Sequence, residues 1–347
     1  MPACCCRSGR HEAADAAITD TADARGHVSE STAARVAADH VRRNWIVGVL
    51  LAALGVLFFS LRPILIKLAY GYAQDPITLL ALRMAFSAPF FAVAAMWTNR
   101  RGTLKPLSRR DLALVVLLGL LSYYAASFLD FLALQYISAG LGRLLLFLYP
   151  TIVVMLSAVL LARPVSAREL LALGLTYAGL ALVLLQSIRG GGHDVLLGAA
   201  LAMGSSVCYA TYLVAGGQVI ARVGSMRFSA YAMVAATVAC VLQFLVMRPF
   251  AALQLPLPVF GYAMLMAVFC TVIPVFLTSE ALRRVGASTV AIVGALGPVS
   301  TILLGWIGLE EVLTPVQLAG VALVVVGVLA VTLTPARAAE NGTREGK

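Results

Sequence analysis

Charge is scarce in this sequence. Of its 347 residues, 12% are charged and 61% are hydrophobic, and the mean hydropathy is +0.92. A soluble globular domain carries about 25% charged residues. The shortage of charge therefore excludes an ordinary soluble domain and indicates a polytopic membrane protein.

Lysine is nearly missing. Only Lys67, Lys105 and Lys347 occur among the 26 basic residues, so the net charge of +10 comes mainly from arginine. No basic cluster is interleaved with aromatic residues, as nucleic-acid binding would require. In so apolar a chain the positive excess reports orientation in the membrane. We expect a lipid bilayer as partner and no nucleic acid.

Histidine is absent from every long apolar run. The four histidines, which all lie outside these runs, are His11, His27, His40 and His193. A membrane enzyme that acts on lipid would need His, Asp or Glu clustered at the interface for acid–base chemistry. No such cluster occurs, so we expect a protein that is not an enzyme and has no cofactor.

The six cysteines do not form a disulfide framework. Three lie inside apolar runs, where a thiol behaves as a small hydrophobe: Cys208, Cys240 and Cys270. Three more lie together at the N-terminus: Cys4, Cys5 and Cys6. Acylation or metal binding there are alternatives to free thiols, but no second ligand pair has the spacing of a zinc site. We expect no metal.

Long apolar runs are abundant. Each is close to the roughly 20 residues that a helix needs to cross the hydrocarbon, and none alternates as a barrel strand would. The predicted spans are residues 45–70, 77–97, 112–134, 141–161, 170–185, 195–214, 228–247, 259–281, 288–309 and 316–333. The expected fold class is an all-α membrane protein with ten transmembrane helices. Residues 1–44 are expected to be a disordered tail, and residues 336–347 a second tail.

One stretch of the chain occurs twice. The sequence that begins at Leu134 aligns without a gap with the one that begins at Leu282, an offset of 148 residues (282 − 134). Identical residues fall in step, among them Pro150 with Pro298 and Gly179 with Gly327. Internal repeats predict repeated architecture. We expect two five-helix halves, residues 45–186 and 195–335.

The odd number of helices in each half predicts that the two halves have opposite orientations. With the N-terminus inside, eleven basic residues lie in the inner connectors, whereas the outer connectors carry only Arg189 and Arg248. Short cytoplasmic loops collect Lys and Arg. We therefore expect both termini in the cytoplasm of a cell whose inner or plasma membrane holds the protein.

Polar residues within the spans are candidates for a substrate cavity. Two spans carry three such residues on one helix face: Tyr123, Ser127 and Asp130 on the third, and Ser205, Tyr209 and Tyr212 on the sixth. Lipid offers no partner for a hydroxyl, so these groups either face a cavity or bond neighbouring helices. The cavity suits the tyrosines better, and interhelical bonding suits the serines better.

Two prolines and several charges also fall within the spans. Pro150 and Pro298 each remove a backbone hydrogen bond and can kink a helix, which leaves a conformational or a packing role open. Asp130 and Arg143 flank one short turn, so we expect them to form an ion pair. Glu280 lies four residues before Arg284, a favourable helical pair.

The pattern resembles the drug/metabolite transporter superfamily, EamA type. The residues that carry the resemblance are Lys67 at the end of the first span, DPITLLALR with Arg83, the turn LQYISAGL, LYPTIVVMLSAVLL with Pro150, and GPVSTILLGWIGLEE with Gly297, Pro298 and Glu310. One departure is clear. The family usually ends its fourth helix with a glutamate, where this sequence has Ala162 and Arg163.

The resemblance implies two inverted five-helix repeats around a central cavity, and secondary transport of small organic solutes, commonly export of amino acids or related metabolites. The expected cavity residues are Tyr123, Ser127, Asp130, Arg143, Tyr149, Pro150, Ser205, Tyr209, Tyr212 and Pro298. We hypothesise alternating access coupled to protons through Asp130, with the aromatic rings holding an ammonium group. A passive channel and an uptake permease are the alternatives, and the protein is expected to be a monomer or a homodimer.

The distribution of basic residues gives a topology prediction. A phosphatase fused after Pro335 should be inactive because it stays in the cytoplasm, and one fused within residues 190–192 should be active outside. Enzyme activity of the two fusions in intact cells is the measurement. The opposite pattern of activities would overturn the predicted orientation.

Overall fold

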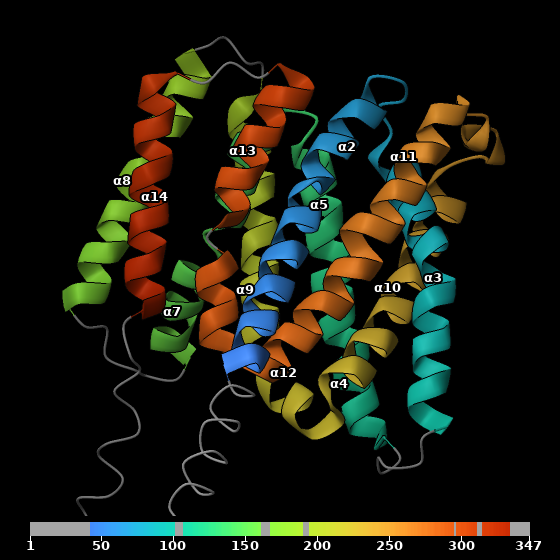
Figure 1. Ribbon diagram of the computed structural model, residues 1–347. Helices are drawn as coiled ribbons and strands as arrows, with labels where there is room; N and C mark the ends of the chain where they lie inside the picture. Colours follow the sequence, from blue (N-terminus) through green and yellow to red (C-terminus); the bar gives the residue numbers. More distant parts are fainter. Residues whose placement is uncertain are drawn as a thin grey trace, which may run out of the picture. The chain divides into compact units, whose positions relative to one another are not determined.

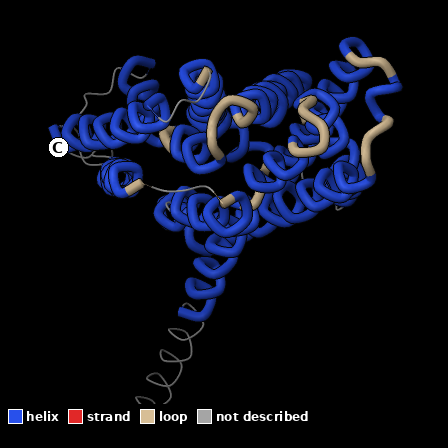
Figure 2. The backbone as a smooth tube through the Cα atoms, turned by 90° about the horizontal axis from the view of Figure 1, so that it is seen from above, coloured by secondary structure: helices blue, strands red, loops and turns tan. Residues whose placement is uncertain are grey.

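The computed structural model describes residues 42–100, 107–160, 167–189, 194–294, 296–310 and 314–333. Within these ranges the chain is built from helices and short turns, without a strand (Figure 2). The predicted all-α class is confirmed. The N-terminal cysteines, most of both tails and the position of the missing glutamate at residues 162–163 lie outside the described residues.

The helices of the first half follow the first five predicted spans. The first span is a helix over residues 42–60 followed by α2 (Arg62–Tyr70). The others are α3 (Pro76–Arg100), α4 (Arg109–Gly119), the π-helix η1 (Leu120–Ala125), α5 (Ala126–Ala133), α6 (Ala139–Leu146), α7 (Tyr149–Leu160) and α8 (Ala167–Arg189). Residues 42–48 and residues 49–333 belong to two separate units.

The second half follows the remaining spans (Figure 1). It contains α9 (Val195–Val223), α10 (Ser225–Met247), the 3-10 helix η2 (Phe250–Leu253), α11 (Leu257–Ala267), the π-helix η3 (Val268–Val272), α12 (Ile273–Gly294), α13 (Leu296–Leu309) and α14 (Pro315–Leu333). Only Gly224 separates α9 from α10, and its φ of 88° is a conformation that favours glycine.

The described part of the chain contains eight helical segments that are long and apolar enough to cross a bilayer. Two shorter apolar helices, Leu296–Leu309 and Pro315–Ala330, correspond to the ninth and tenth predicted spans. Many large apolar side chains are exposed, including Leu171 at 76% and Val246 at 84%. Such a surface suits lipid and not water, as expected of a multi-pass membrane protein.

One predicted connector is wrong. Residues 282–287 were expected to join the eighth and ninth spans, but α12 continues through them to Gly294. Arg283 and Arg284 are therefore helical residues, and Arg284 donates to Glu280 at 2.6 Å, as the predicted helical pair requires. The segment contains one glycine, Gly286, and no proline. A single glycine weakens a helix by roughly 0.5–1 kcal/mol but does not end it.

The two π-helices occupy equivalent positions in the two halves. They begin at Leu120 and Val268, which are separated by the repeat offset of 148 residues (268 − 120). In this alignment Tyr123 corresponds to Thr271. A π-turn leaves its backbone groups bonded one residue further apart than in an α-helix and frequently occurs at functional sites. The shared irregularity supports the repeat independently of residue identity.

Small residues hold α8 against α14 (Figure 1). A Cβ built at Gly179 would lie 2.5 Å from the carbonyl oxygen of Gly320, and one at Gly320 would lie 2.6 Å from Cγ2 of Val183. Gly327 is as close to Ala172 and Thr176. Residue numbers rise along one helix as they fall along the other, so the helices are antiparallel. Close backbone approach through small residues is the usual packing of membrane helices.

Two apolar cores flank the middle of the larger unit. One includes Leu144, Leu148, Ala202 and Val324, and joins α6, α7, α8, α9 and α14. The other contains the buried side chains of Ile66, Leu80, Met84, Phe131 and Met233, and joins α2, α3, α5, α10 and α11. Each core contains residues from both halves of the chain, so the halves do not fold as separate globules.

The glycine contacts between α8 and α14 predict a position-specific effect of alanine. Gly179→Ala places a methyl group against backbone, which cannot move aside as a side chain can, and should destabilise the protein by about 1–3 kcal/mol. Gly174 on the same helix has open space around it, because a Cβ there would meet nothing within 4 Å, so Gly174→Ala should leave stability unchanged or slightly raise it. Thermal unfolding in detergent compares the two variants. Equal unfolding temperatures would contradict the close packing.

Candidate functional site

The first span is broken where it meets its only buried arginine. The helix of residues 42–60 stops at Leu61, and α2 restarts with Arg62 and Pro63. Proline has no N–H and is tolerated in the first turn of a helix but not in its interior. Ser60 donates to Val56 at 2.8 Å and lies 3.2 Å from the carbonyl oxygen of Gly297 on α13. Arg62 thus lies buried inside the bundle, next to a serine that bonds the first span to α13.

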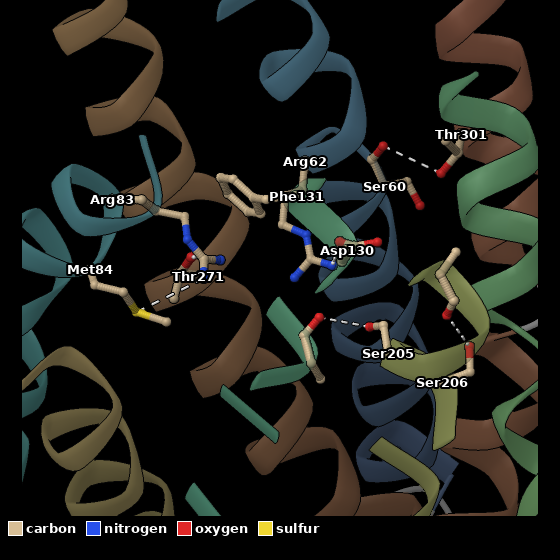
Figure 3. Close-up of polar contacts among 12 residues, drawn as sticks. Ser60, Arg62, Arg83, Met84, Asp130, Phe131, Ser205, Ser206, Thr271 and Thr301 are labelled. Atoms are coloured by element: carbon tan, nitrogen blue, oxygen red, sulfur yellow. Dashed lines mark hydrogen bonds and ion pairs between the residues drawn. The ribbon is translucent and has the colours of Figure 1, made fainter. Parts of the chain in front are cut away.

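Arg62 forms a buried ion pair with Asp130 of α5 (Figure 3). Its Nη2 atom lies 2.5 Å from Oδ2 of Asp130, and the residues are 6% and 3% exposed. The predicted partner of Asp130 was Arg143, and that prediction is wrong. The arginine of the first span, and not that of α6, therefore takes the carboxylate.

Arg143 lies close to this pair without joining it. It interacts electrostatically with Arg62, Asp130, Tyr149 and Tyr209. No described residue accepts a hydrogen bond from its guanidinium, whose Nε is buried without a partner. Its Cζ atom is 4.7 Å from the centre of the Phe59 ring, and that of Arg62 is 4.5 Å from the same ring. Cation–π attraction to one ring therefore holds both arginines.

Gly297 makes the space that Arg143 occupies. A Cβ built at Gly297 would lie 2.7 Å from Nη2 and 3.3 Å from Nε of Arg143. Gly297 and the buried Pro298 form the first turn of α13, and Tyr149 and Pro150 form the first turn of α7. Pro150 follows the turn at residues 147–148 as the second residue of α7, where its missing N–H is tolerated.

Arg83 of α3 is the third arginine of the site. It is 2% exposed, and its Nη1 lies 3.4 Å from Oγ1 of Thr271 in η3. Its Cζ is 5.1 Å from the ring centre of Phe131, next to Asp130 in the chain (Figure 3). Thr271 in turn donates to the carbonyl oxygen of Met266 at 3.0 Å, five residues earlier. The π-helix of the second half thus positions a partner for an arginine of the first half.

The four predicted tyrosines form one continuous cluster. Ring centres are 5.0 Å apart for Tyr149 and Tyr209, 5.7 Å for Tyr209 and Tyr212, and 6.0 Å for Tyr123 and Tyr212. The rings come from η1, α7 and α9. Arg143 lies within electrostatic range of Tyr149 and Tyr209, so the cluster is close to the charged group.

The predicted serines lie nearby, and Ser205 bonds between helices. Its hydroxyl donates to the carbonyl oxygen of Ala126 at 2.8 Å, and the neighbouring Ser206 donates to that of Leu145 at 2.7 Å (Figure 3). Leu145 lies beside the turn between α6 and α7, and its carbonyl oxygen also accepts from the backbone N–H of Leu148 at 3.2 Å, so Ser206 adds a second hydrogen bond at this turn. Ser127 is buried at 7% exposure.

The remaining motif residues lie away from this group. Lys67 of α2 is half-buried. Glu310, after α13, is exposed and has a φ of 53°, as expected for a solvated residue at a helix end. Among the described residues there is no group of three or more His, Cys, Asp or Glu side chains that could hold a metal ion.

Two ion pairs connect the halves at opposite ends of α10. Arg248 follows its C-terminus and donates to both carboxylate oxygens of Asp75, at 2.9 and 3.1 Å. Burial alone would raise the pKa of Asp75, but hydrogen bonds from Arg248 and Thr78 outweigh it and hold the pKa below its ordinary value. Arg222, just before the N-terminus of α10, pairs with Asp111 of α4 at 3.1 Å.

Comparison with known proteins places the chain in a class of membrane transporters. It matches the EamA-like transporter family twice, over residues 46–185 and 196–333, which together make up most of its length. The chain therefore belongs to the EamA-like transporter family, with one copy of the family domain in each half. The predicted resemblance is confirmed.

Relatives with assigned names are also transporters. The chain is 30% identical to the uncharacterized transporter YcbK of Bacillus subtilis over 289 residues, 80% of this chain and 90% of that protein. It is 28% identical to the threonine/homoserine exporter RhtA of Escherichia coli over 215 residues, 60% of this chain and 67% of the exporter. A solved crystal structure with 22% identity has the same fold, with a TM-score of 0.57 over 82% of this chain and 97% of the other.

Sequence reasoning missed the role of Arg62 and its neighbours Phe59 and Ser60. An available signal was the Arg62–Pro63 pair in the middle of an apolar run, because proline inside a span predicts a break and arginine there predicts a partner. The ring of Phe59 carried no comparable signal, since one phenylalanine in an apolar helix resembles any other.

The Arg62–Asp130 pair predicts strong coupling between these two residues. Arg62→Gln or Asp130→Asn should each destabilise the protein by about 3–5 kcal/mol, because each leaves a buried charge unpaired. The double variant should recover part of that loss. Thermal unfolding of the single and double variants in detergent measures the coupling.

The pair of Asp130 with Arg143 provides the matched comparison. Arg143→Gln removes a charge that attracts Asp130 without forming an ion pair with it, so it should couple to Asp130→Asn much more weakly than Arg62→Gln does. Stronger coupling of Asp130 to Arg143 than to Arg62 would restore the pair expected from the sequence.

Proposed function

We propose that this protein is a secondary carrier that exports small organic solutes across the cell inner membrane by alternating access. The observation that carries the proposal is the buried charged and aromatic group to which both family domains contribute. Arg62, Asp130 and Arg143 come from the first domain, and Tyr209 and Thr271 from the second. A site at the junction of two repeats can open to either side as one repeat moves against the other.

The proposed architecture is ten spans in two inverted repeats with both termini in the cytoplasm. The antiparallel packing of α8 and α14 supports it, because these helices are each the last of a repeat. The Asp75–Arg248 pair supports it as well, because it joins the N-terminal end of α3 to the C-terminal end of α10, the second long helix of each repeat. Opposite directions of equivalent helices are what inversion requires.

We propose amino acids or related metabolites as the solutes. The name of the relative RhtA, an exporter of threonine and homoserine, supports this class. The site offers opposite charges within a small region, and an amino acid carries opposite charges on adjacent groups. Its ammonium group suits Asp130 and the tyrosine rings, since both attract a cation.

Coupling to protons is proposed to act through Asp130. Among the described residues it is the carboxylate most deeply buried in the bundle, at 3% exposure. A proton and the ammonium group of a solute would compete for the same carboxylate, so that one drives the other across the membrane as the repeats move.

The test is transport into inverted membrane vesicles with an acidic interior. Labelled threonine and phenylalanine should accumulate against their gradients, and Asp130→Asn should abolish this accumulation while downhill exchange remains measurable. Asp194→Asn, which alters an exposed carboxylate before α9, is the matched control and should transport normally. Undiminished accumulation by Asp130→Asn would remove Asp130 from the coupling mechanism.

The same vesicles distinguish the alternatives. A carrier saturates as solute concentration rises, whereas flux through a passive channel rises in proportion. An uptake permease would accumulate solute in right-side-out vesicles under the natural gradient and would not do so in inverted ones. Either result would replace the proposed export mechanism.

A further inference from the structure

The site carries more positive than negative charge. Three buried arginines, Arg62, Arg83 and Arg143, surround one buried carboxylate, that of Asp130, and no other described acidic side chain is buried. Arg62 neutralises Asp130, and Arg83 is held by Thr271 and the Phe131 ring. Arg143 has a cation–π contact with the Phe59 ring and an attraction to Asp130, but forms no ion pair with a described carboxylate.

Burial without an acceptor is unfavourable for an arginine. The guanidinium has five N–H donors and cannot lose its charge in a protein, so a buried donor without an acceptor, such as Nε of Arg143, remains desolvated. Arg143 is 9% exposed, and none of the described residues accepts a hydrogen bond from it. Arginines inside a membrane bundle are otherwise paired or face a substrate pathway.

The surroundings of Arg143 keep its guanidinium free. Gly297 has no side chain where a Cβ would lie 2.7 Å from Nη2, and the Phe59 ring contacts the cation without using its N–H groups. Tyr149 and Tyr209 interact with the same guanidinium on the side of the tyrosine cluster. The donors are therefore held beside the aromatic surface of the site and are not hydrogen-bonded to any of the residues that the structure describes.

We propose that Arg143 binds the carboxylate of the transported solute. A guanidinium fork matches a carboxylate with two parallel hydrogen bonds, and the bound anion would neutralise the charge that the chain leaves uncompensated. The tyrosine cluster would contact the remainder of the solute, and Asp130 an ammonium group where the solute has one. This inference rests on the proposed function and specifies which group of the solute the carrier recognises.

Binding to the full-length protein in detergent tests the inference. The probes are threonine and phenylalanine, their amides, which lack the carboxylate, and the corresponding acids without an ammonium group. The wild type should bind the amino acids more tightly than the amides. Arg143→Gln should weaken amino-acid binding by at least about tenfold and leave amide binding unchanged, because it removes one partner of a buried charge pair.

Two further variants keep the test valid if Arg143→Gln does not fold. Arg143→Lys retains the charge but not the fork, and should bind with intermediate affinity. Gly297→Ala keeps every charge and displaces the guanidinium by a methyl group, so it should also weaken carboxylate binding. Arg189→Gln, at an exposed position at the end of α8, is the control and should bind as the wild type does.

Each outcome decides the question. The proposal is supported if Arg143→Gln and Gly297→Ala lose the preference for carboxylate over amide. Tight binding of the acids without an ammonium group shows that the carboxylate alone is enough for binding. The proposal is overturned if the wild type binds the amino acids no more tightly than their amides, for threonine and for phenylalanine alike. The proposal is also overturned if chloride saturates the Arg143 site and carboxylates then have no further effect on binding.

Failure of the proposed function would look different. Binding of the probes in detergent does not require the protein to alternate between the two sides of a membrane. A protein that binds carboxylates through Arg143 but transports none in vesicles is therefore not a carrier, and the assignment of the site stands. Saturable transport with equal rates for wild type and Arg143→Gln would keep the carrier and overturn the role of Arg143.

Discussion

The structure depends on one ion pair that is almost completely removed from solvent. A charge inside a membrane bundle is tolerated only when the fold supplies a partner for it, and Arg62 and Asp130 supply each other. To meet, they require that the first span and α5 place the guanidinium and the carboxylate at the same depth. The Phe59 ring, the Ser60 hydroxyl and the opening turn of α13 are arranged around that contact.

Irregular backbone is concentrated around the same place. The turn at Leu61, the turn between α6 and α7 and the two π-helices all lie where helices of the two halves meet, and hydroxyl side chains bond backbone carbonyl oxygens there: Ser60 and Ser206 bond across the halves, and Thr271 bonds within its own segment. Non-helical backbone at membrane depth is tolerated only where protein or a polar space covers it. The regular helices, by contrast, present apolar side chains outward, as α8 and α10 do.

Apolar runs were sufficient to predict the helices, because a bilayer accepts little else. The same signal could not locate the end of α12, since residues 282–287 are compatible with helix and only tertiary packing decides. The tyrosines were grouped correctly from helical spacing, which fixes a face within one helix. The partner of Asp130 was not predicted, because spacing along the chain says nothing about which distant helix reaches a given depth. The partner comes from the first span, since Arg62 lies 68 residues before the aspartate in the sequence (130 − 62).

The matched π-helices also carry information about descent. A π-turn accommodates one residue more than the α-helix that flanks it, and the repeat alignment has no gap between η1 and η3. If the extra residue had entered one half after the halves became distinct, the other would be a residue shorter at that point. A matched π-turn without a gap is what duplication of a half-length chain that already contained the irregularity would produce.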